Sequence, residues 1–388
     1  MIVEHLSLVD FRNYASAEVS LVAGPNVFVG RNGQGKTNLA EAIGYFATLG
    51  SHRVSQDAPM VRYGADAAFV RARLGYGDRR IQLEAQLNRS GSNKARVNGS
   101  SVRTSELPRY AQVVLFAPED LQIVRGDPSS RRRFADQLLV QRSPRMTGVL
   151  ADYDRVLKQR TALLKSARAR SLKAEQLTTL DVWDDKLVSL GTEIILARLR
   201  LAEDLAQPMR DAYEAIAGAD HDPQLEWVLT VEGADPEDDG AAVTRAGSAI
   251  GADAVAASFR AGLAAKRAQE LERGVTLVGP HRDDLLLRLR GLPVKGYASH
   301  GESWSTALSL RLSSAQLLRD QLRLGDPIVV LDDVFAELDA DRRVRLAGVV
   351  ADFEQVIVTA AVEGDVPEAL RVRTVRVEAG TIVTDADV

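Results

Sequence analysis

The sequence predicts an α/β fold in which a helical arm is inserted into a head made of mixed sheets. Three observations lead to this prediction: a glycine-rich loop near the N-terminus, an apolar strand ending in two acids near the C-terminus, and a long helical pattern between them. The loop and the acids belong to one kind of site, so most of the intervening chain has to leave the head and return. We therefore expect residues 1–127 and 274–388 to form the head and residues 128–273 to form the arm.

The first motif runs from Gly30 to Thr37 and fits the P-loop pattern G-x-x-x-x-G-K-[ST], with an apolar strand at Val27–Val29 before it and a helical pattern after it. Its glycines let backbone N–H groups turn onto phosphate oxygens, and the helix adds the positive end of its dipole. Lys36 can reach the β- and γ-phosphates, and the Thr37 hydroxyl can ligate Mg²⁺. The candidate ATP-binding residues are Gly30, Arg31, Asn32, Gly33, Gln34, Gly35, Lys36, Thr37 and Asn38.

The second motif is a run of four apolar residues followed by Asp332 and Asp333. Asp332 would hold Mg²⁺ together with Thr37, and Asp333 would act as a general base that polarises the attacking water. Lys36 and Asp333 are therefore the candidate catalytic residues. Two alternatives stay open: a glycine-rich turn that matches the P-loop by chance, and a plain strand that enters an N-capped helix.

Composition narrows the class of protein. A chain of 388 residues is too long for one compact core, so two domains are expected. Cysteine is absent, which excludes disulfides, thiolate metal sites and thiol nucleophiles. The N-terminal stretch has no apolar signal segment, and no apolar run approaches the length that spans a bilayer. We expect a soluble, cytoplasmic protein with no membrane partner.

Charge is distributed unevenly behind a net charge of −4. Residues 52–110 hold 11 Lys and Arg against 5 Asp and Glu, residues 129–173 hold 12 against 3, and residues 219–240 hold none against 8. Two basic regions of this kind can bind a polyanion such as DNA, although solvated faces of ordinary helices and hairpins are the alternative. The candidate phosphate contacts are Arg71, Arg73, Arg79, Arg80, Arg131, Arg132 and Arg133.

Strand signals surround the first motif. Alternating residues at 17–22 predict a β-hairpin, and residues 67–103 predict a small antiparallel sheet with a tight turn at Asn98-Gly99. Further strands are expected at Val113–Phe116 and Leu285–Leu289.

Helical signals dominate from about 128 to 210, starting with Asp127 as cap and Pro128 in the first turn. Two apolar seams predict a short antiparallel coiled-coil arm, with a buried bundle face as the alternative. A loop at 235–249, a helix to about Arg273 and a long helix from Trp304 to about Arg323 follow. The two seams are Leu180, Trp183, Leu187, Leu190, Ile194, Ala197, Leu201 and Leu150, Tyr153, Leu157, Leu164.

Taken in chain order, the motifs resemble those of the RecF family, the bacterial recombination-repair ATPases related to SMC proteins and ABC ATPases. The resemblance runs along the whole chain, and the combination is far more specific than any one tripeptide. The matching segments are Asp10 to Tyr14, Gly30 to Asn38, Glu41 to Ile43, Ser51 to Arg53, Phe116 to Leu121, Arg132-Arg133, Gly279 to Asp284, Leu331 to Asp333, and Glu337 to Asp339.

The resemblance implies an ABC-type ATPase head with a helical arm, with ATP and Mg²⁺ held between two heads of an ATP-dependent homodimer. The ABC signature would face the γ-phosphate of the other subunit, and the D-loop would lie at the dimer seam. Thr359 or Ala360 stands where transporters carry a switch His, which predicts slow turnover. Glu302 stands where many ABC members carry Gln. The residues that the signature and D-loop add to the ATP site are Ser299, Gly301, Glu302 and Asp339.

The resemblance also implies a function: ATP-dependent DNA binding in recombinational repair at gaps and stalled replication forks, linked to DNA replication and the SOS response. The dimer would act as a clamp on double-stranded DNA at a gap or a single-strand/double-strand junction. It would help RecO and RecR load recombinase. A weak, DNA-stimulated ATPase would reset the clamp, and the protein would be associated with the nucleoid.

Other functions compete with this one. An SMC-like structural DNA tether would need longer coiled coils than about three heptads. A transporter-type nucleotide-binding subunit is disfavoured by the helical insertion and by an Asp-Asp pair in place of Asp-Glu. A P-loop kinase or a nuclease subunit is the remaining alternative, and no second acidic cluster for a two-metal nuclease is evident.

Overall fold

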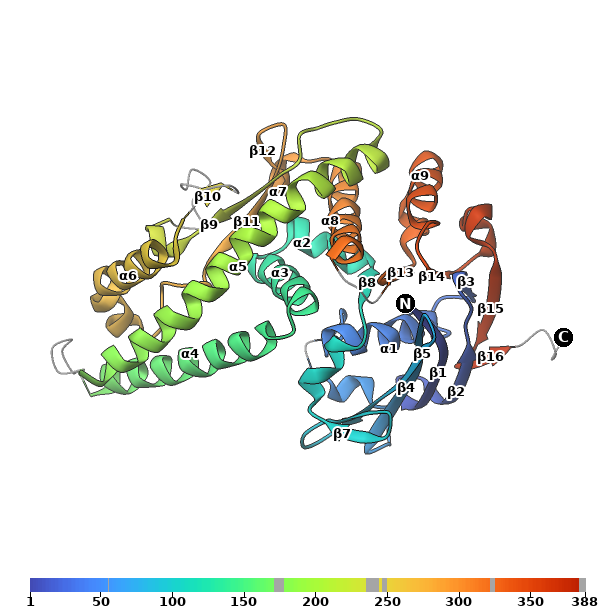
Figure 1. Cartoon of the computed structure of the whole chain (residues 1–388), viewed down its shortest axis with the longest axis horizontal. Helices are drawn as coiled ribbons and strands as arrows, with labels where there is room; N and C mark the ends of the chain where they lie inside the picture. Colours follow the sequence, from blue (N-terminus) through green and yellow to red (C-terminus); the bar gives the residue numbers. More distant parts are fainter. Residues whose placement is uncertain (55, 171–177, 235–243, 246–249, 322–324, 384–388) are drawn as a thin grey trace. The chain divides into compact units, whose positions relative to one another are not determined.

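The computed structural model divides the chain into two compact units (Figure 1). The head unit comprises residues 1–121, 208–220 and 301–388, and the arm unit comprises residues 122–207 and 221–300. The structure describes the whole chain except residues 55, 171–177, 235–243, 246–249, 322–324 and 384–388. Most of the loop expected at 235–249 and the expected end of the long helix near Arg323 therefore lie outside the described residues.

These units differ from the expected domains in three places. Residues 122–127 and 274–300 belong to the arm unit, and residues 208–220 belong to the head unit. The last difference arises because helix α5 (Thr178–Ala217) is continuous over 40 residues and contributes only its last turns to the head. The boundaries of independently folding domains stay a prediction.

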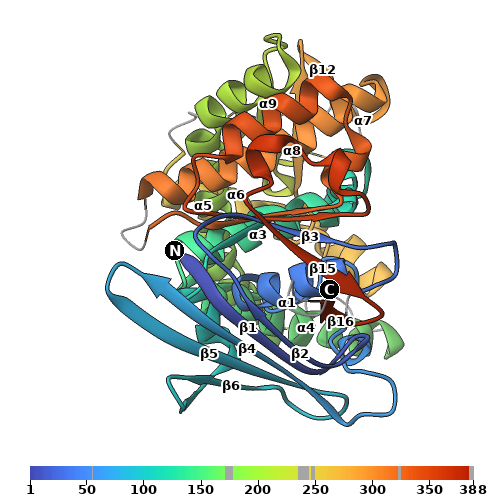
Figure 2. The ribbon, with the colours of Figure 1, turned by 90° about the vertical axis from the view of Figure 1, so that its right-hand side faces the viewer.

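An antiparallel sheet of six strands, sheet A, forms one layer of the head unit, in the order β2-β1-β4-β5-β6-β7 (Figure 2). The predicted N-terminal hairpin and the predicted sheet at 67–103 are both confirmed within it. The predicted tight turn is also confirmed, because Asn98 and Gly99 both have positive φ, at 50° and 81°. The strands are β1 (Ile2–Phe11), β2 (Tyr14–Ser20), β4 (Ala67–Tyr76), β5 (Arg79–Asn88), β6 (Lys94–Val97) and β7 (Ser100–Val102).

The second layer of the head, sheet B, is parallel except for its edge strand and has the order β16-β15-β3-β14-β13-β8. Its central strands are buried along almost their whole length, as expected for a parallel sheet covered on both faces. The strands are β3 (Gly24–Val29), β8 (Val113–Phe116), β13 (Ile328–Asp332), β14 (Gln355–Ala360), β15 (Arg373–Glu378) and β16 (Thr381–Val383).

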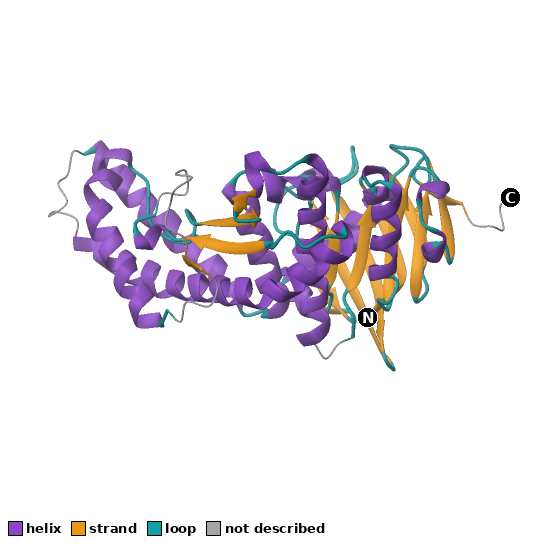
Figure 3. Cartoon of the chain, turned by 90° about the horizontal axis from the view of Figure 1, so that it is seen from above, coloured by secondary structure: helices purple, strands orange, loops and turns teal. Residues whose placement is uncertain are grey.

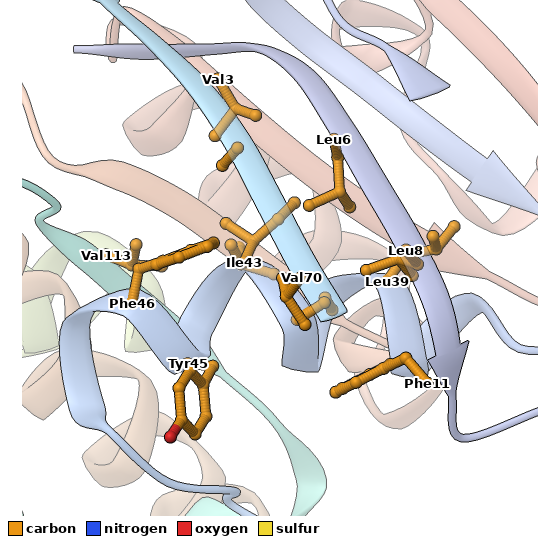
Figure 4. Close-up of a cluster of buried hydrophobic side chains, with 14 of the residues drawn as sticks. Val3, Leu6, Leu8, Phe11, Leu39, Ile43, Tyr45, Phe46, Val70 and Val113 are labelled. Carbon is orange, nitrogen blue, oxygen red and sulfur yellow. The ribbon is translucent and has the colours of Figure 1, made fainter. Parts of the chain in front are cut away.

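Helix α1 (Lys36–Thr48) packs into the apolar core of the head unit (Figure 4). Leu39 and Ile43 meet Leu6 and Leu8 of β1 there, and all four side chains are buried. Burial extends around most of the helix, so the amphipathic face predicted from the sequence is only part of what is covered. Because the P-loop leads directly into α1, this packing fixes the direction in which the first helical turn points.

Two further long helices of the head come from the C-terminal half of the chain, whereas its 3₁₀ turns occur in both halves. The helices are α8 (His300–Gln321) and α9 (Ala340–Val350). These turns are η1 (Ala58–Met60), η2 (Thr104–Arg109), η3 (Pro118–Asp120), η6 (Val334–Glu337), η7 (Glu363–Asp365) and η8 (Glu368–Leu370).

The arm unit is mainly helical, and its two long helices α4 and α5 run antiparallel, as predicted. Arg160 of α4 binds Asp184 of α5 at 2.6 Å, whereas Arg145, at the start of α4, binds Glu193 further along α5. A Cβ on Gly191 would lie 2.4 Å from the ring of Phe259 in α6, so a third helix closes the core. The helices are α2 (Leu121–Arg125), α3 (Pro128–Arg142), α4 (Met146–Ala169), α5, α6 (Ala252–Arg273) and α7 (Val294–Tyr297).

The predicted seams are only partly the buried faces. Leu187 and Ile194 of α5 are buried, but so are Val188 and Ile195 beside them. Burial on two sides of α5 agrees with the alternative prediction, a buried bundle face, better than with a single coiled-coil seam. On α4, the expected Tyr153 and Leu164 are buried, whereas the expected Leu150 and Leu157 are half-buried beside the buried Val149 and Val156, so that seam is confirmed at two of its four residues.

A small antiparallel sheet, sheet C, also belongs to the arm unit, where Figure 3 shows its strands among the helices. Its order is β10-β9-β11-β12. The strands are β9 (Gln224–Val228), β10 (Thr244–Arg245), β11 (Asp284–Leu289) and β12 (Leu292–Pro293), with a 3₁₀ turn η5 (Thr230–Glu232) after β9. The strand predicted at Leu285–Leu289 is confirmed, but β9 was not predicted.

Buried ion pairs hold the arm unit together. Arg160 is fully buried and donates to Asp184 at 2.6 Å and to Glu270 of α6 at 2.7 Å. Arg198 of α5 likewise donates to Asp136 of α3, with both nitrogen–oxygen distances at 2.9 Å. Each pair joins two helices, so these arginines act as cross-links inside the unit. No helix among the described residues is both long enough and apolar enough to cross a membrane.

Candidate functional site

The P-loop sits between the end of β3 and the start of α1, and two of its glycines are required by geometry. Gly35 caps α1 with φ at 119°, a conformation that L side chains rarely adopt. A Cβ on Gly30 would lie 2.2 Å from the carbonyl oxygen of Val377 on β15. The loop is therefore pressed against the neighbouring strand, and the first-turn N–H groups of α1, which have no intrahelical acceptor, face outward from it.

Side chains from the β1–β2 hairpin brace the loop from outside. Asn13 Nδ2 donates to the carbonyl oxygen of Gln34 at 2.9 Å, and the Tyr14 hydroxyl donates to that of Gly35 at 3.0 Å. Asn38 Nδ2 donates in turn to Asn13 Oδ1 at 2.7 Å. Burial raises the pKa of Tyr14, so its hydroxyl keeps its proton and stays a donor. The sequence singled out Asn13 and Tyr14 only within the segment Asp10 to Tyr14 that resembles the family. It did not predict that they hydrogen-bond to the P-loop backbone.

Lys36, Thr37 and Asp332 meet at the edge of sheet B where the parallel strands end. Lys36 is buried, and its Nζ donates to the Arg31 carbonyl oxygen at 3.3 Å across the loop. Thr37 Oγ1 donates to Asp332 Oδ1 at 3.0 Å, and Thr359 Oγ1 donates to the same oxygen at 2.6 Å. A hydroxyl and a carboxylate this close together are the hard oxygen ligands that Mg²⁺ takes. The residues present therefore fit a magnesium ion bound with a nucleotide.

Thr359 has its place because β13 and β14 are in register. Asp332 pairs with Thr359 across the two strands, which puts the hydroxyl beside the carboxylate. Thr359 also accepts from the backbone N–H of Asp333 at 2.9 Å, so it holds both acids. The sequence indicated Thr359 or Ala360 as the switch position, and Thr359 is the one that contacts the acids.

Asp333 lies just beyond β13 and has a positive φ of 50°. Its side chain is half-buried, and desolvation raises its pKa; the positive charge of Lys36 opposes this shift, and Asp332 adds to it. A carboxylate with a raised pKa beside Lys36 has the properties that a general base needs. Glu119, at the start of η3, also acts on this pKa, so the segment after β8 borders the site.

Two further groups near the site were not assigned from the sequence. His52 Nε2 lies 3.7 Å from Asp332 Oδ2, on the side away from the two threonines. Arg12 donates to Glu41 of α1 at 2.7 and 2.5 Å, and Glu41 is buried. The only signal for either was the family resemblance at Asp10 to Tyr14, Glu41 to Ile43 and Ser51 to Arg53.

The signature and D-loop candidates form a second group. Helix α8 begins at His300, so Ser299 precedes it and Gly301 and Glu302 lie in its first turn. The boundary between the two units falls between His300 and Gly301, which puts Ser299 in the arm unit. Within the head unit, Asp339 caps α9 by accepting from the backbone N–H of Arg342 at 2.9 Å.

Arg342 contacts two of the three head members of this group, Gly301 and Asp339. Its Nη1 donates to Asp339 Oδ2 at 2.6 Å. The capping hydrogen bond from the Arg342 backbone and the positive charge of its side chain lower the pKa of Asp339. Its guanidinium nitrogens would lie 3.1 Å from a Cβ added to Gly301, so the group covers that glycine. No sequence signal distinguished Arg342 from its neighbours on α9.

The candidate phosphate-contacting arginines separate into two kinds. Arg71 and Arg73 of β4 are on the outer face of sheet A and pair with Glu84 and Glu4, each at 3.3 Å. Arg79 is exposed, and Arg80 pairs with Glu4. Arg131 is wrong as a surface contact, because it is buried and bound to Asp284 at 2.6 Å. Arg132 is half-buried and donates to the Asp283 carbonyl oxygen at 2.7 Å, whereas Arg133 is exposed.

Comparisons with known proteins agree with this architecture. The family described as the RecF/RecN/SMC N terminal domain matches residues 2–383. A DNA replication and repair protein RecF from Clavibacter sepedonicus is 58% identical over 387 residues, covering 99% of this chain and 95% of that protein. The protein of the same name from Streptomyces avermitilis is 53% identical over 387 residues, covering 98% and 99%.

Solved structures show the same fold. The structure described as the recombination mediator protein RecF-ATP in the RecFOR pathway has a TM-score of 0.85 at 25% identity, covering 98% of this chain and 96% of that one. A Pyrococcus furiosus Smc head domain has a TM-score of 0.52 at 15% identity, covering 98% and 94%, which supports the fold alone. Fold and site together define an ABC-type ATPase head of the SMC kind. Within that class, the chain belongs to the RecF family.

Proposed function

We propose that this protein is an ATP-dependent DNA-binding protein of recombinational repair that acts at gaps and stalled replication forks. The observation that carries the proposal is the cluster in which Thr37 and Thr359 both donate to Asp332 beside the P-loop. That arrangement is prepared for a nucleotide with its cation, and the names of the relatives supply the biological setting. ATP and Mg²⁺ are the proposed cofactors, and the cytoplasm, at the nucleoid, is the proposed location.

Each residue of the cluster has a distinct task in this proposal. Lys36 and the first-turn N–H groups of α1 hold the β- and γ-phosphates. Thr37 and Asp332 would hold the magnesium ion, which when bound neutralises charge on the phosphates. Asp333 accepts the proton of the attacking water, and Thr359 keeps both acids in place. Because Thr359 is a neutral hydroxyl where transporters carry His, we propose a weak, DNA-stimulated ATPase that resets the protein slowly.

The second group of residues acts on the nucleotide of another copy. Ser299, Gly301, Glu302 and Asp339 would complete the ATP site of a partner head, so that ATP drives a homodimer. Arg342, by covering Gly301 and binding Asp339, would keep these two residues of the head unit at a fixed separation. The ATP-bound dimer would act as a clamp on DNA and help RecO and RecR load recombinase.

Mixing two inactive variants tests the composite site. A Lys36→Ala homodimer has two damaged P-loops, and a Ser299→Arg homodimer has two damaged signature loops. A mixed dimer collects both lesions in one site and leaves the other intact. Random pairing makes about half the dimers mixed, so the mixture should recover about a quarter of wild-type ATPase.

The measurement is ATPase rate against total protein concentration for each variant alone and for the mixture. Two matched controls are the Lys36→Ala protein mixed with itself at doubled concentration, and wild type mixed with Ser299→Arg. If the mixture never exceeds either parent while Ser299→Arg still binds ATP, the proposed action of Ser299 on a partner is wrong.

A further inference from the structure

A groove of about 220 Å³ crosses the outer face of sheet A, over β4, β5 and β6 in the head unit. Phe69 and Arg71 of β4 line one side of it, and Lys94 and Arg96 of β6 line the other. These side chains are on the face opposite the apolar core, because Val70 and Ala95, their alternates along the strands, are buried. None of the residues that line the groove belongs to the P-loop cluster or to the signature and D-loop group.

Strand register explains why these side chains converge. Phe69 is opposite Gln86, which is opposite Lys94, and Arg71 is opposite Glu84, which is opposite Arg96. The two rows are adjacent, so an aromatic ring and three cations share one small area of sheet. The Arg71 guanidinium lies over the Phe69 ring, 5.6 Å from its centroid.

The charge in the groove is positive. Arg71 is the member with a carboxylate partner, Glu84, at 3.3 Å. Lys94 and Arg96 are exposed, and within the described part of the chain no acidic group lies within ion-pair distance of either. The groove therefore holds three cations against one carboxylate, Glu84, next to an aromatic ring. Such a surface attracts an anion that carries a flat ring.

A nucleic-acid strand has that chemistry. Proteins that bind single strands combine a positively charged groove for the backbone with aromatic side chains on which bases stack, and sheet faces are a common platform for this. A duplex presents its phosphates outward and keeps its bases stacked inside, so it could use the cations but not the ring. The volume of the groove is suited to a base and its phosphate rather than to a folded partner.

We propose that this groove binds single-stranded DNA, with phosphates on Lys94 and Arg96 and a base on Phe69. The inference rests on the proposed function in taking DNA as the substrate, and it deepens that function by assigning the single-stranded side of a gap to the outer face of sheet A. Binding here needs no residue of the nucleotide site, so it takes place with or without ATP.

The test measures the affinity of the full-length chain, without nucleotide, for a fluorescent single-stranded oligonucleotide and for a duplex of the same length. Lys94→Gln with Arg96→Gln removes two phosphate contacts and should lower the slope of log affinity against log salt by about 1.4, at about 0.7 per contact on single strands. Phe69→Leu keeps an apolar side chain and should weaken single-strand binding about tenfold through lost stacking. Duplex affinity should change little with Phe69→Leu.

A matched control removes two cations elsewhere: Arg155→Gln with Lys158→Gln, both exposed on α4 in the arm unit. The control should leave the single-strand salt slope at its wild-type value. An equal loss in both double variants, or an equal effect of Phe69→Leu on duplex and single strands, would overturn the proposal. If the groove variants still dimerise normally with ATP, such a result contradicts only the groove proposal and leaves the proposed ATPase intact.

Two outcomes concern the occupant. If a dinucleotide or inorganic phosphate at equal phosphate concentration competes as well as the oligonucleotide, the groove is an anion site without strand recognition, and the proposal is wrong. If wild type binds neither DNA form with or without ATP, the proposed function fails, and the groove proposal fails with it.

Discussion

Arginines on the outer face of sheet A and arginines in the core of the arm unit have opposite structural roles. In the head, Arg71 and Arg73 lie on the solvent face of a sheet, each partly exposed and paired with an acid on a neighbouring strand. In the arm, Arg131, Arg160 and Arg198 are buried and bound to carboxylates from distant segments. The charge of a segment therefore indicates neither a binding surface nor a structural core by itself.

The difference follows from whether water or other helices surround each arginine side chain. A sheet with one buried face sends alternate side chains to water, where a salt bridge contributes little to stability. The inner faces of the arm helices are covered by other helices, so a guanidinium buried there needs hydrogen-bond acceptors, acids among them, to offset its desolvation. Arg160 meets this need with Asp184, Glu270 and the Thr276 hydroxyl.

The largest expected effect is on Arg160. Replacing it with Met should lower the free energy of unfolding by about 3–5 kcal/mol, because Glu270 is left fully buried without its cation. Urea unfolding followed by circular dichroism measures the change. Arg155→Met, an exposed position on the same helix, is the control and should change stability by less than about 0.5 kcal/mol. Equal effects at the two positions would remove the contrast between buried and surface arginines.

A smaller effect concerns how two buried side chains of the arm unit make its stability depend on pH. Burial lowers the pKa of His281 to about 3, whereas burial raises that of Asp283 to about 6. As pH falls from about 6.5, the unfolded chain protonates the histidine first, which reduces stability. Between pH 6 and 4 the native state protonates Asp283 before the unfolded chain does, which increases stability. The two contributions oppose each other over that interval.

His281→Gln should expose the contribution of Asp283. Compared with wild type, the variant should gain about 3 kcal/mol of stability on going from pH 6 to pH 4, since each pKa unit is worth about 1.4 kcal/mol. The measurement is the urea midpoint at a series of pH values. Asp283→Asn should do the reverse and lose stability over the same interval. Parallel pH profiles for wild type and both variants would show that neither group titrates as the buried geometry requires.

The smallest effect belongs to the head surface. Arg73→Gln removes one cation that pairs with Glu4 at 3.3 Å, while Arg80 stays beside the same carboxylate. Stability should fall by less than about 1 kcal/mol, and the difference should shrink further in high salt. Thermal unfolding at low and high ionic strength measures both quantities. A loss of stability above about 2 kcal/mol would show that Arg73 contributes as much as a buried arginine of the arm unit, and would contradict this prediction.

Much of the head could be predicted because its signals are local. The P-loop motif, its flanking strand and helix, the apolar strand ending at Asp332, and the Asn98-Gly99 turn each depend on adjacent residues. The family resemblance then supplied the ABC-type fold. Together these identified Lys36, Thr37 and Asp332 at the positions where the structure brings them together.

What could not be predicted depends on pairing between distant residues. Strand β9 was missed because its partner β11 lies about sixty residues further along the chain, and Thr359 reaches Asp332 only through strand register. Arg342 is one of several arginines on α9, and only the position of Gly301 distinguishes it. Arg131 was misassigned because its partner Asp284 is 153 residues away. Charge and periodicity carry no information about such contacts.

The strand order of sheet B has a consequence for synthesis on the ribosome. Strand β3, which carries the P-loop, has β14 and β15 as its neighbours, and both come from the last part of the chain. At about 5–20 residues per second, β3 leaves the ribosome tens of seconds before either neighbour exists. During that interval its apolar residues and unpaired backbone are exposed, while most of the arm can already be complete. The nucleotide site is therefore assembled at the end of synthesis, and nascent chains that stall before β14 have a P-loop sequence without a P-loop site.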